Sequence, residues 1–221
     1  GLFVDAMSKH KPSVCILNGD AIDGDGKRSG GCELITTDRD EQVEMAIDVV
    51  KAVGAKEHYF VRGTPYHTGI AEQFEDNLAK AFNAKAHDHP QIEIGGFIFD
   101  CKHKIGSSSV PYGRATQLGK EITWNQEWAA YKGIELADVF IRSHVHYHSR
   151  IQRPRGPKIV QAATTPALQW RGTRYGKQQC MGTVDFGVLF AYVYPTRVEL
   201  VAELMEIDEG FSPIIHSNNK R

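Results

Sequence analysis

Several short runs rich in apolar residues are each followed by a residue that can bind a metal ion. The runs at residues 14–17, 59–61, 97–101 and 138–142 precede, in that order, Asp20, His67, His103 and the pair His144 and His146. Such runs are typical of buried strands, and ligands gather beyond the carboxyl ends of strands in open α/β sheets. Carboxylate and imidazole ligands without thiolates suit Mn, Fe, Zn or Ni rather than a Cys-rich structural zinc site. The pattern therefore predicts a metal centre at one sheet edge.

Neighbouring residues extend or qualify this prediction. Residues two apart on an extended segment point the same way, so we expect His144 and His146 to face one site together. His148 either extends this row or points to solvent. Asp23 either is a turn residue beside residues 24–26 or orients a metal ligand from behind.

The elements that must position these residues follow from hydrophobic periodicity and capping signals. We expect helices at residues 2–10, 38–53, 70–82 and 114–131, and strands at residues 14–17, 59–61, 92–94, 97–101, 138–142, 158–162, 187–194 and 198–207. The outline is α/β for the first two thirds of the chain and β-rich at the end. Because no repeat, low-complexity tract or linker interrupts the sequence, we expect a single domain spanning residues 1–221.

Composition narrows the class of protein. A hydrophobic fraction of 41% and a charged fraction of 24% argue against a disordered or fibrous chain. The longest purely apolar stretch, residues 188–194, is far shorter than the roughly 18 residues of a membrane span, so no membrane association is expected. The four cysteines are widely scattered, and the chain opens without a signal-peptide pattern. Both features favour reduced thiols and a cytoplasmic location.

Charge is distributed unevenly along the chain. The net charge of −1 argues against a general nucleic-acid coat protein. Residues 139–184 nevertheless contain no Asp or Glu, and their basic residues are Arg142, Arg150, Arg153, Arg155, Lys158, Arg171, Arg174 and Lys177. This segment is either a solvated basic face or a surface that accepts phosphate.

The strand-end residues form a series of motifs. In chain order the motifs are Gly19-Asp20-x-x-Asp23, Gly63-Thr64-Pro65-Tyr66-His67, a lone His103 and Ser143-His144-x-His146. In kind, order and interval they resemble the calcineurin-like metallophosphoesterases, whose motifs include a Gly-Asn-His-type segment and Gly-His-x-His. Arg62 before the second motif, with Thr-Pro-Ala-Leu-Gln at residues 165–169, is similar to the bacteriophage-type members. The resemblance spans about residues 14–207.

This resemblance implies a fold and a reaction. The fold would be a four-layer α/β-β/α sandwich with mixed sheets, holding two divalent metal ions that hydrolyse phosphate mono- or diesters. Two such cations roughly 3.5–4 Å apart lower the pKa of a bridging water and stabilise the entering and leaving oxygens. Manganese is the first expectation, with Fe, Zn or Ni as alternatives. A phage-encoded protein would act in the host cytoplasm.

The resemblance also implies roles for individual residues. Asp20 would bridge both metals, with His103 and His144 on one and His146 on the other. Thr64 replaces the Asn that usually ligates the first of these metals, so the resemblance makes Thr64 the candidate ligand at that position. His67 and Asp23 are the expected catalytic residues, and His67 would stabilise charge or protonate the leaving oxygen.

Two groups of basic residues are candidates for binding substrate. Arg62 and Arg142 each precede a motif residue by two positions, so we expect them to clamp phosphate. Arg171, Arg174 and Lys177 either belong to a loop that closes over the substrate or are surface charges.

One family motif is not found. An Asp-x-His motif ends the first strand of the family and supplies ligands to the metal that His146 would bind, but residues 2–7 read as the helix after that strand. Either the N-terminal strand is missing from this chain or the protein is a degenerate member, with one metal site left vacant. The alternatives to a phosphoesterase are a nuclease that acts on DNA or RNA, a non-catalytic phage scaffold or binding protein, and a metallo-β-lactamase-type hydrolase. The oligomeric state stays open.

Overall fold

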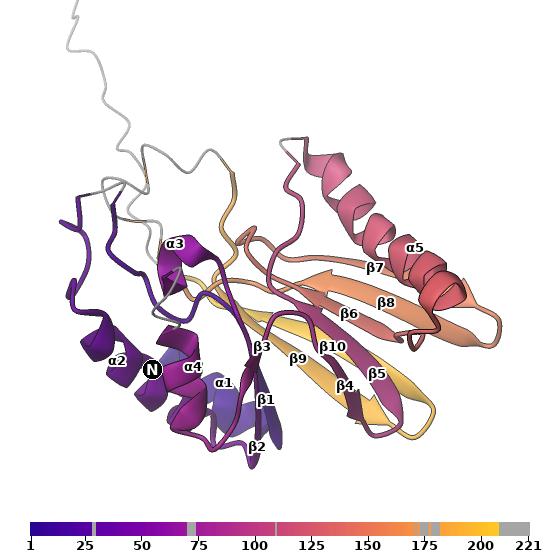
Figure 1. The fold of residues 1–221 in the computed structure, drawn as a ribbon, viewed down its shortest axis with the longest axis horizontal. Helices are drawn as coiled ribbons and strands as arrows, with labels where there is room; N and C mark the ends of the chain where they lie inside the picture. The colour runs from indigo at the N-terminus through magenta and orange to yellow at the C-terminus, as the bar shows by residue number, and fades with distance from the viewer. Residues whose placement is uncertain are drawn as a thin grey trace, which may run out of the picture.

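The computed structural model of the protein describes residues 1–27, 30–69, 74–108, 110–170, 172, 177 and 182–207 (Figure 1). Its helices are α1 (Leu2–His10), α2 (Arg39–Val53), α3 (Pro65–Thr68), α4 (Phe74–Lys80) and α5 (Arg114–Lys132), with a 3₁₀ turn η1 (Pro111–Gly113). Its strands are β1 (Val14–Asn18), β2 (Glu57–Val61), β3 (Ala86–His87), β4 (Gln91–Ile94), β5 (Phe97–Lys102), β6 (Val139–Arg142), β7 (Ser149–Arg155), β8 (Lys158–Thr164), β9 (Gly187–Tyr194) and β10 (Arg197–Leu204).

The strands form three sheets. A parallel three-stranded sheet has the order β1-β2-β3, and a five-stranded mixed sheet has the order β4-β5-β6-β8-β7. Within the larger sheet, β5, β6 and β8 are parallel, whereas β4 and β7 run antiparallel to their neighbours. Strands β9 and β10 form an antiparallel pair. The carboxyl ends of β5 and β6 therefore meet at one edge, with Lys102 opposite Arg142.

Hydrophobic clusters show how the layers stack. Helices α2 and α4 pack on the β1-β2-β3 sheet through Val43, Leu78 and Phe60. Helix α5 packs on the five-stranded sheet through Ile122 and Phe140, at the opposite side of the molecule (Figure 1). A third cluster, which includes Val61, Phe99, Ile141 and Leu200, joins the inner faces of the sheets. The expected α/β fold with mixed sheets between helical layers is confirmed.

The N-terminus of α2 illustrates how local signals produce an element. Asp38 precedes the helix, and its Oδ1 accepts the backbone N–H groups of Asp40 at 2.9 Å and of Glu41 at 3.3 Å. Such a cap contributes about 1 kcal/mol because it satisfies donors that have no intrahelical partner. The helix ends at Gly54, which adopts a left-handed conformation with φ 72°. The predicted helix at residues 38–53 is confirmed to within one residue.

Several boundaries differ from those expected. Helix α4 ends at Lys80, two residues before the predicted end, and residues 70–73 lie outside the described part of the chain. Strand β7 was not predicted because it is an edge strand with mostly exposed side chains and contains Pro154. The short α3 and β3 were not predicted either. The predicted strands at residues 92–94 and 97–101 are confirmed as β4 and β5, which form a hairpin about Gly95 and Gly96.

An apolar cavity of about 550 Å³ lies between the first sheet and the β9–β10 pair. Its wall includes Ile16 and Leu17 of β1, Leu189 and Val193 of β9, and Met7 of α1. Among the described residues, β1 pairs with β2 and β9 pairs with β10, so the opposite edges of both strands face this cavity. The two sheets are thus separated by apolar space rather than by strand pairing.

None of the helices within the described residues combines the length and the apolar character that crossing a bilayer requires.

Candidate metal centre

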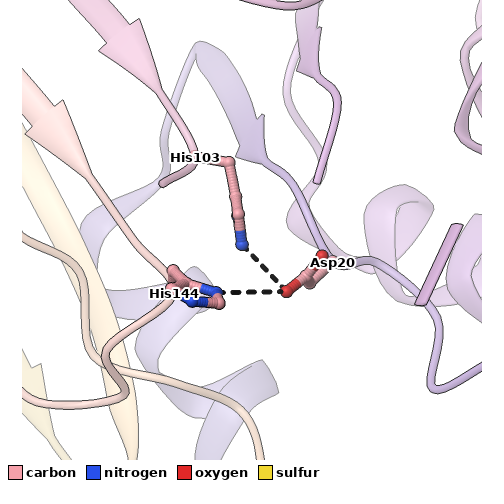
Figure 2. Close-up of side chains that lie close together, drawn as sticks. All are labelled: Asp20, His103 and His144. Carbon is pink, nitrogen blue, oxygen red and sulfur yellow. Dashed lines mark ion pairs between the residues drawn. The ribbon is translucent and has the colours of Figure 1, made fainter. Parts of the chain in front are cut away.

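Three side chains converge beyond the ends of three strands. Asp20 follows β1, His103 follows β5 and His144 follows β6, and one potential ligand atom of each lies within 4.8 Å of the others. Figure 2 shows both imidazoles directed at the Asp20 carboxylate. Asp20 Oδ2 lies 2.8 Å from His103 Nε2 and 3.9 Å from His144 Nδ1. Strand pairing of β5 with β6 brings the two histidines to the same edge, and β1 delivers the carboxylate from the other sheet.

A hydrogen bond of His103 to the main chain determines which of its ring nitrogens carries the proton and which is an acceptor facing Asp20. His103 is only 4% exposed, and its Nδ1 lies 2.7 Å from the carbonyl oxygen of Asn18. Because a carbonyl can only accept, Nδ1 carries a proton, and in the neutral ring Nε2 presents a lone pair. This lone pair faces a carboxylate oxygen at 2.8 Å, so two acceptors confront each other. Either a proton or a cation between them is required to make this arrangement favourable.

The pKa shifts describe the case in which a proton lies between them. Burial lowers the pKa of His103, but the hydrogen bond to Asp20 and the charge of that carboxylate raise it above its usual value. Burial raises the pKa of Asp20, yet the hydrogen bond from His103 and the nearby imidazole of His144 hold it well below its usual range. A divalent cation favours the same carboxylate and would replace the proton. The donor set therefore fits a metal ion, with the Asn18 carbonyl orienting one ligand from behind.

The loop that carries Asp20 is tightly packed against the loop that follows β2. Asp20 Oδ1 accepts the backbone N–H of Thr64 at 2.6 Å and lies 3.1 Å from the Thr64 hydroxyl. A Cβ at Gly63 would overlap Asp20 Oδ1, and a Cβ at Gly19 would lie 2.8 Å from Gly63 Cα. Glycine is therefore required at both positions for the backbones to approach. Thr64, the predicted metal ligand, lies beside the carboxylate and hydrogen-bonds to it.

The predicted catalytic residue His67 lies at the margin of this cluster. Its Nε2 is 3.9 Å from Asp20 Oδ2, and its Nδ1 is 2.9 Å from the carbonyl oxygen of Asp23. The carbonyl fixes the proton on Nδ1 and leaves Nε2 directed at the cluster. Asp23 itself is exposed, and it contacts His67 through its main chain. A role for the Asp23 carboxylate, in catalysis or in orienting a ligand, stays a prediction.

His146 does not belong to the converging set of three. The backbone at His144 and His146 has φ values of 73° and 57°, so this segment is not extended and the reason for expecting both side chains to point the same way does not hold. Burial lowers the pKa of His146, as does the charge of His144, and Asp20 opposes this change. The charges of the cluster therefore affect the pKa of His146, although His146 is not one of the three converging residues. Asp20 also has a positive φ, of 54°, and such conformations gather at functional sites.

The two predicted phosphate clamps are instead held in ion pairs. Arg142 is 1% exposed, and its Nη2 lies 2.6 Å from Asp100 Oδ1 and 2.7 Å from Glu121 Oε2. Arg62 binds Asp76 at 2.7 Å and Asp88 at 3.2 Å, which raise its pKa above its usual value. The Arg142 prediction is corrected, because this guanidinium is out of reach of solvent and its charge is balanced by carboxylates. Arg62 is partly exposed, so its role as a phosphate clamp stays a prediction.

The acid-free segment is neutralised in part by acids that lie outside it. Besides Arg142, Arg155 contacts Asp138 at 2.7 Å and Lys158 lies 3.7 Å from the same carboxylate. Lys177 is exposed, and Arg171 and Arg174 lie outside the described residues. The interpretation of this segment as one phosphate-accepting surface is therefore weakened, because folding supplies the carboxylates that the local sequence lacks.

One buried acid was missed by the sequence analysis. Glu75 of α4 is 2% exposed and accepts the backbone N–H groups of Ala21 at 3.1 Å and of Gly63 at 2.5 Å. Burial raises its pKa to about 7, and the two backbone hydrogen bonds oppose that increase. A signal did exist, because Glu75 shares a helical face with the buried Leu78 and Ala79 at spacings of three and four.

Comparisons with known proteins give likenesses to solved structures. No protein-family model matches the sequence, and no curated protein matches it. A single mutant of Vps29 from Entamoeba histolytica is 12% identical, with 92% of this chain and 88% of that chain covered and a TM-score of 0.47. A novel archaeal phosphodiesterase is 14% identical, with 90% and 88% covered and a TM-score of 0.45. Wild-type Vps29 from E. histolytica complexed with Zn²⁺ is 11% identical, with 73% and 75% covered and a TM-score of 0.39. All three scores are below 0.5, so the assignment of the site rests on its own geometry.

Proposed function

We propose that this chain is a metal-dependent phosphoesterase that hydrolyses phosphate mono- or diesters, with Asp20, His103 and His144 holding a divalent cation. The observation that carries the proposal is the approach of His103 Nε2 to Asp20 Oδ2 at 2.8 Å, with the third ligand atom within 4.8 Å. Two acceptors at this distance require positive charge between them, and this ligand set suits Mn, Fe, Zn or Ni.

The cation would supply Lewis acidity, which lowers the pKa of water and withdraws charge from a phosphoryl oxygen. Around it the residues of the chain have separate tasks. Asp20 and His103 hold their ligand atoms in place through Thr64 and Asn18 respectively. His67, with Nδ1 bound to the Asp23 carbonyl, keeps Nε2 available to take up a proton and deliver it to the leaving oxygen.

The proposal includes a second ion, for which Asp20 and His146 would be ligands. Manganese, the bacteriophage-type subfamily, a single domain and a cytoplasmic location stay predictions.

A second candidate function is a binding protein that uses one metal ion without catalysis. The observation that favours it is that the converging set consists of Asp20, His103 and His144, with His146 outside it. Among the described residues this leaves one set of ligands instead of two. Metal stoichiometry and hydrolysis, measured on the same sample, separate the two candidates.

The test compares metal content with activity in the purified chain. We expect at least one bound metal per chain by mass spectrometry after incubation with Mn²⁺, and hydrolysis of p-nitrophenyl phosphate or bis-p-nitrophenyl phosphate. Asp20→Asn and His144→Ala should each abolish metal uptake and lower the rate at least about 100-fold, because they remove a ligand. His87→Ala, an exposed histidine on β3, is the matched control and should change neither quantity.

The outcomes are distinct. Full metal content in both ligand variants would show that the site is assigned to the wrong residues. Bound metal without hydrolysis of either ester would favour the non-catalytic candidate.

A further inference from the structure

Glu75 links the two loops that surround the candidate metal centre. One carboxylate oxygen accepts the N–H of Ala21, directly after Asp20, at 3.1 Å. The other accepts the N–H of Gly63, directly before Thr64, at 2.5 Å. A single side chain from α4 therefore holds two main-chain segments that are 42 positions apart in the sequence, from Ala21 to Gly63.

The position of the Asp20 carboxylate depends on how these loops pack. The Thr64 N–H binds Asp20 Oδ1 at 2.6 Å, and Gly63 has no room for a Cβ because Asp20 would overlap it. Displacement of either loop would therefore move the carboxylate relative to His103 and His144. Glu75 lies beneath this contact and restrains both sides of it.

The burial of the Glu75 carboxylate is energetically unfavourable unless hydrogen bonds replace the water that it loses. At 2% exposure it shares a helical face with the apolar Leu78 and Ala79, where an apolar residue would be expected to pack. A carboxylate in such a place loses hydration, which only well-formed hydrogen bonds offset. Its hydrogen bonds to Ala21 and Gly63 offset part of that loss, and both are to the loops of the metal centre.

We propose that Glu75 is a positioning residue of the metal centre, whose carboxylate ties the Asp20 loop to the Gly63–Thr64 loop and so sets the place of Asp20 Oδ2 opposite His103 and His144. This inference rests on the proposed function, because it assigns Glu75 a role at that metal site. Glu75 lies outside the converging set of ligand residues and would act on the site through the main chain of the two loops.

The experiment measures Mn²⁺ affinity by calorimetric titration, and thermal stability without metal, in four proteins. These are the unsubstituted chain, Glu75→Ala, Glu75→Gln and Leu78→Ala. Residues that orient metal ligands typically change affinity 10–100-fold, so Glu75→Ala should weaken Mn²⁺ binding by about that factor. Glu75→Gln should be intermediate, because its amide oxygen can accept one N–H while its NH₂ group faces the other.

Leu78→Ala separates positioning from general destabilisation. Leu78 is fully buried in the same helix and its side chain forms no hydrogen bond to either loop, so its truncation should lower the melting temperature and leave Mn²⁺ affinity within about 3-fold. Hydrolysis by Glu75→Ala should recover at saturating Mn²⁺, because its defect is in metal affinity, whereas Asp20→Asn should not recover.

Each remaining outcome overturns a specific statement. If the unsubstituted chain binds no Mn²⁺, the proposed function fails and the inference fails with it. If that chain binds Mn²⁺ and Glu75→Ala binds it equally well, only the inference fails. Equal losses of affinity in Glu75→Ala and Leu78→Ala would also overturn it, because α4 would then act as a whole.

Discussion

The candidate metal centre has a histidine side, with His103 and His144, and an Asp20 side. A buried charged side chain lies beneath each, and the two differ in the kind of group that they bind. Beneath the histidine side, Arg142 is 1% exposed and binds Asp100 and Glu121. Beneath the Asp20 side, Glu75 is 2% exposed and binds two backbone N–H groups. Burial raises the pKa values of Asp100 and Glu121, but the charge of Arg142 helps to lower both below their usual values. Burial instead raises the pKa of Glu75 to about 7.

This difference indicates that the charge of Arg142 stabilises the fold, whereas the charge of Glu75 is linked to the metal centre. Arg142 pairs with Asp100 and Glu121, which also pair with His89 and Lys102, so the charges of this network are balanced without a ligand. Glu75 keeps a large part of its desolvation penalty, and buried groups with such shifted pKa values gather where function requires them. We therefore expect the histidine side to control stability and the Asp20 side to respond to metal and pH.

The largest expected effect is on stability, from Arg142→Ala. Removing the guanidinium takes the buried cation from Asp100 and from the half-buried Glu121, whose remaining partners are His89 and Lys102. Breaking a buried pair in this way typically costs about 3–5 kcal/mol of unfolding free energy. Denaturant unfolding measures the loss. Arg62→Ala, which breaks a more exposed pair, is the control and should cost at most about 1 kcal/mol. A stable Arg142→Ala protein with a raised KM would restore the phosphate-clamp prediction.

Next in size is the effect of Gly63→Ala on metal binding. The added Cβ would overlap Asp20, so the two loops must separate and the carboxylate must move. We expect Mn²⁺ affinity to fall at least about 100-fold, which corresponds to roughly 2.7 kcal/mol. Titration calorimetry measures this change. Gly182→Ala, where the nearest atom to the new Cβ is 4.0 Å away, should bind as the original chain does. An unchanged affinity in Gly63→Ala would show that the loop contact does not set the carboxylate.

A change of pH should alter metal affinity by about tenfold per unit. Because the folded-state pKa of His103 is raised above 6.5, a cation must displace a proton from Nε2 below that pKa. Affinity should therefore fall as pH decreases from 6.5 to 5.5. Without metal, the raised pKa contributes stability that is present below pH 6.5 and is lost as the pH rises through the folded value. Melting temperatures with and without Mn²⁺ should respond to pH in opposite directions, and a flat affinity would contradict the proton–metal exchange.

The smallest expected effect comes from His146→Ala. Since His146 lies outside the converging set, its removal should leave the affinity for the first ion within about 3-fold and lower hydrolysis about tenfold through the second. His148→Ala is the matched variant in the same segment, where Nδ1 binds the Thr164 carbonyl at 2.7 Å. It should leave metal stoichiometry unchanged. Loss of the first ion in His146→Ala would place that residue among its ligands.

Much of the architecture could be predicted from residues close together in the sequence. The apolar runs before Asp20, His103 and His144 located the strand ends, because burial on both faces leaves a continuous hydrophobic signal. Asp38 and the apolar spacing after it located α2. Strand β7 escaped prediction because an exposed edge strand carries little of that signal.

The sequence by itself determined which residue types stand at the strand ends, and so which metal chemistry is available. Tertiary structure alone decided that Arg142 turns to Glu121 and Asp100, that His146 stays outside the cluster, and that Glu75 reaches the loops around Asp20. The physical reason is that the hydrophobic periodicity of a sequence depends on which residues of one helix or strand are buried. The partner of a buried charge and the φ angle of a loop residue are set by segments that meet only when the sheets pack.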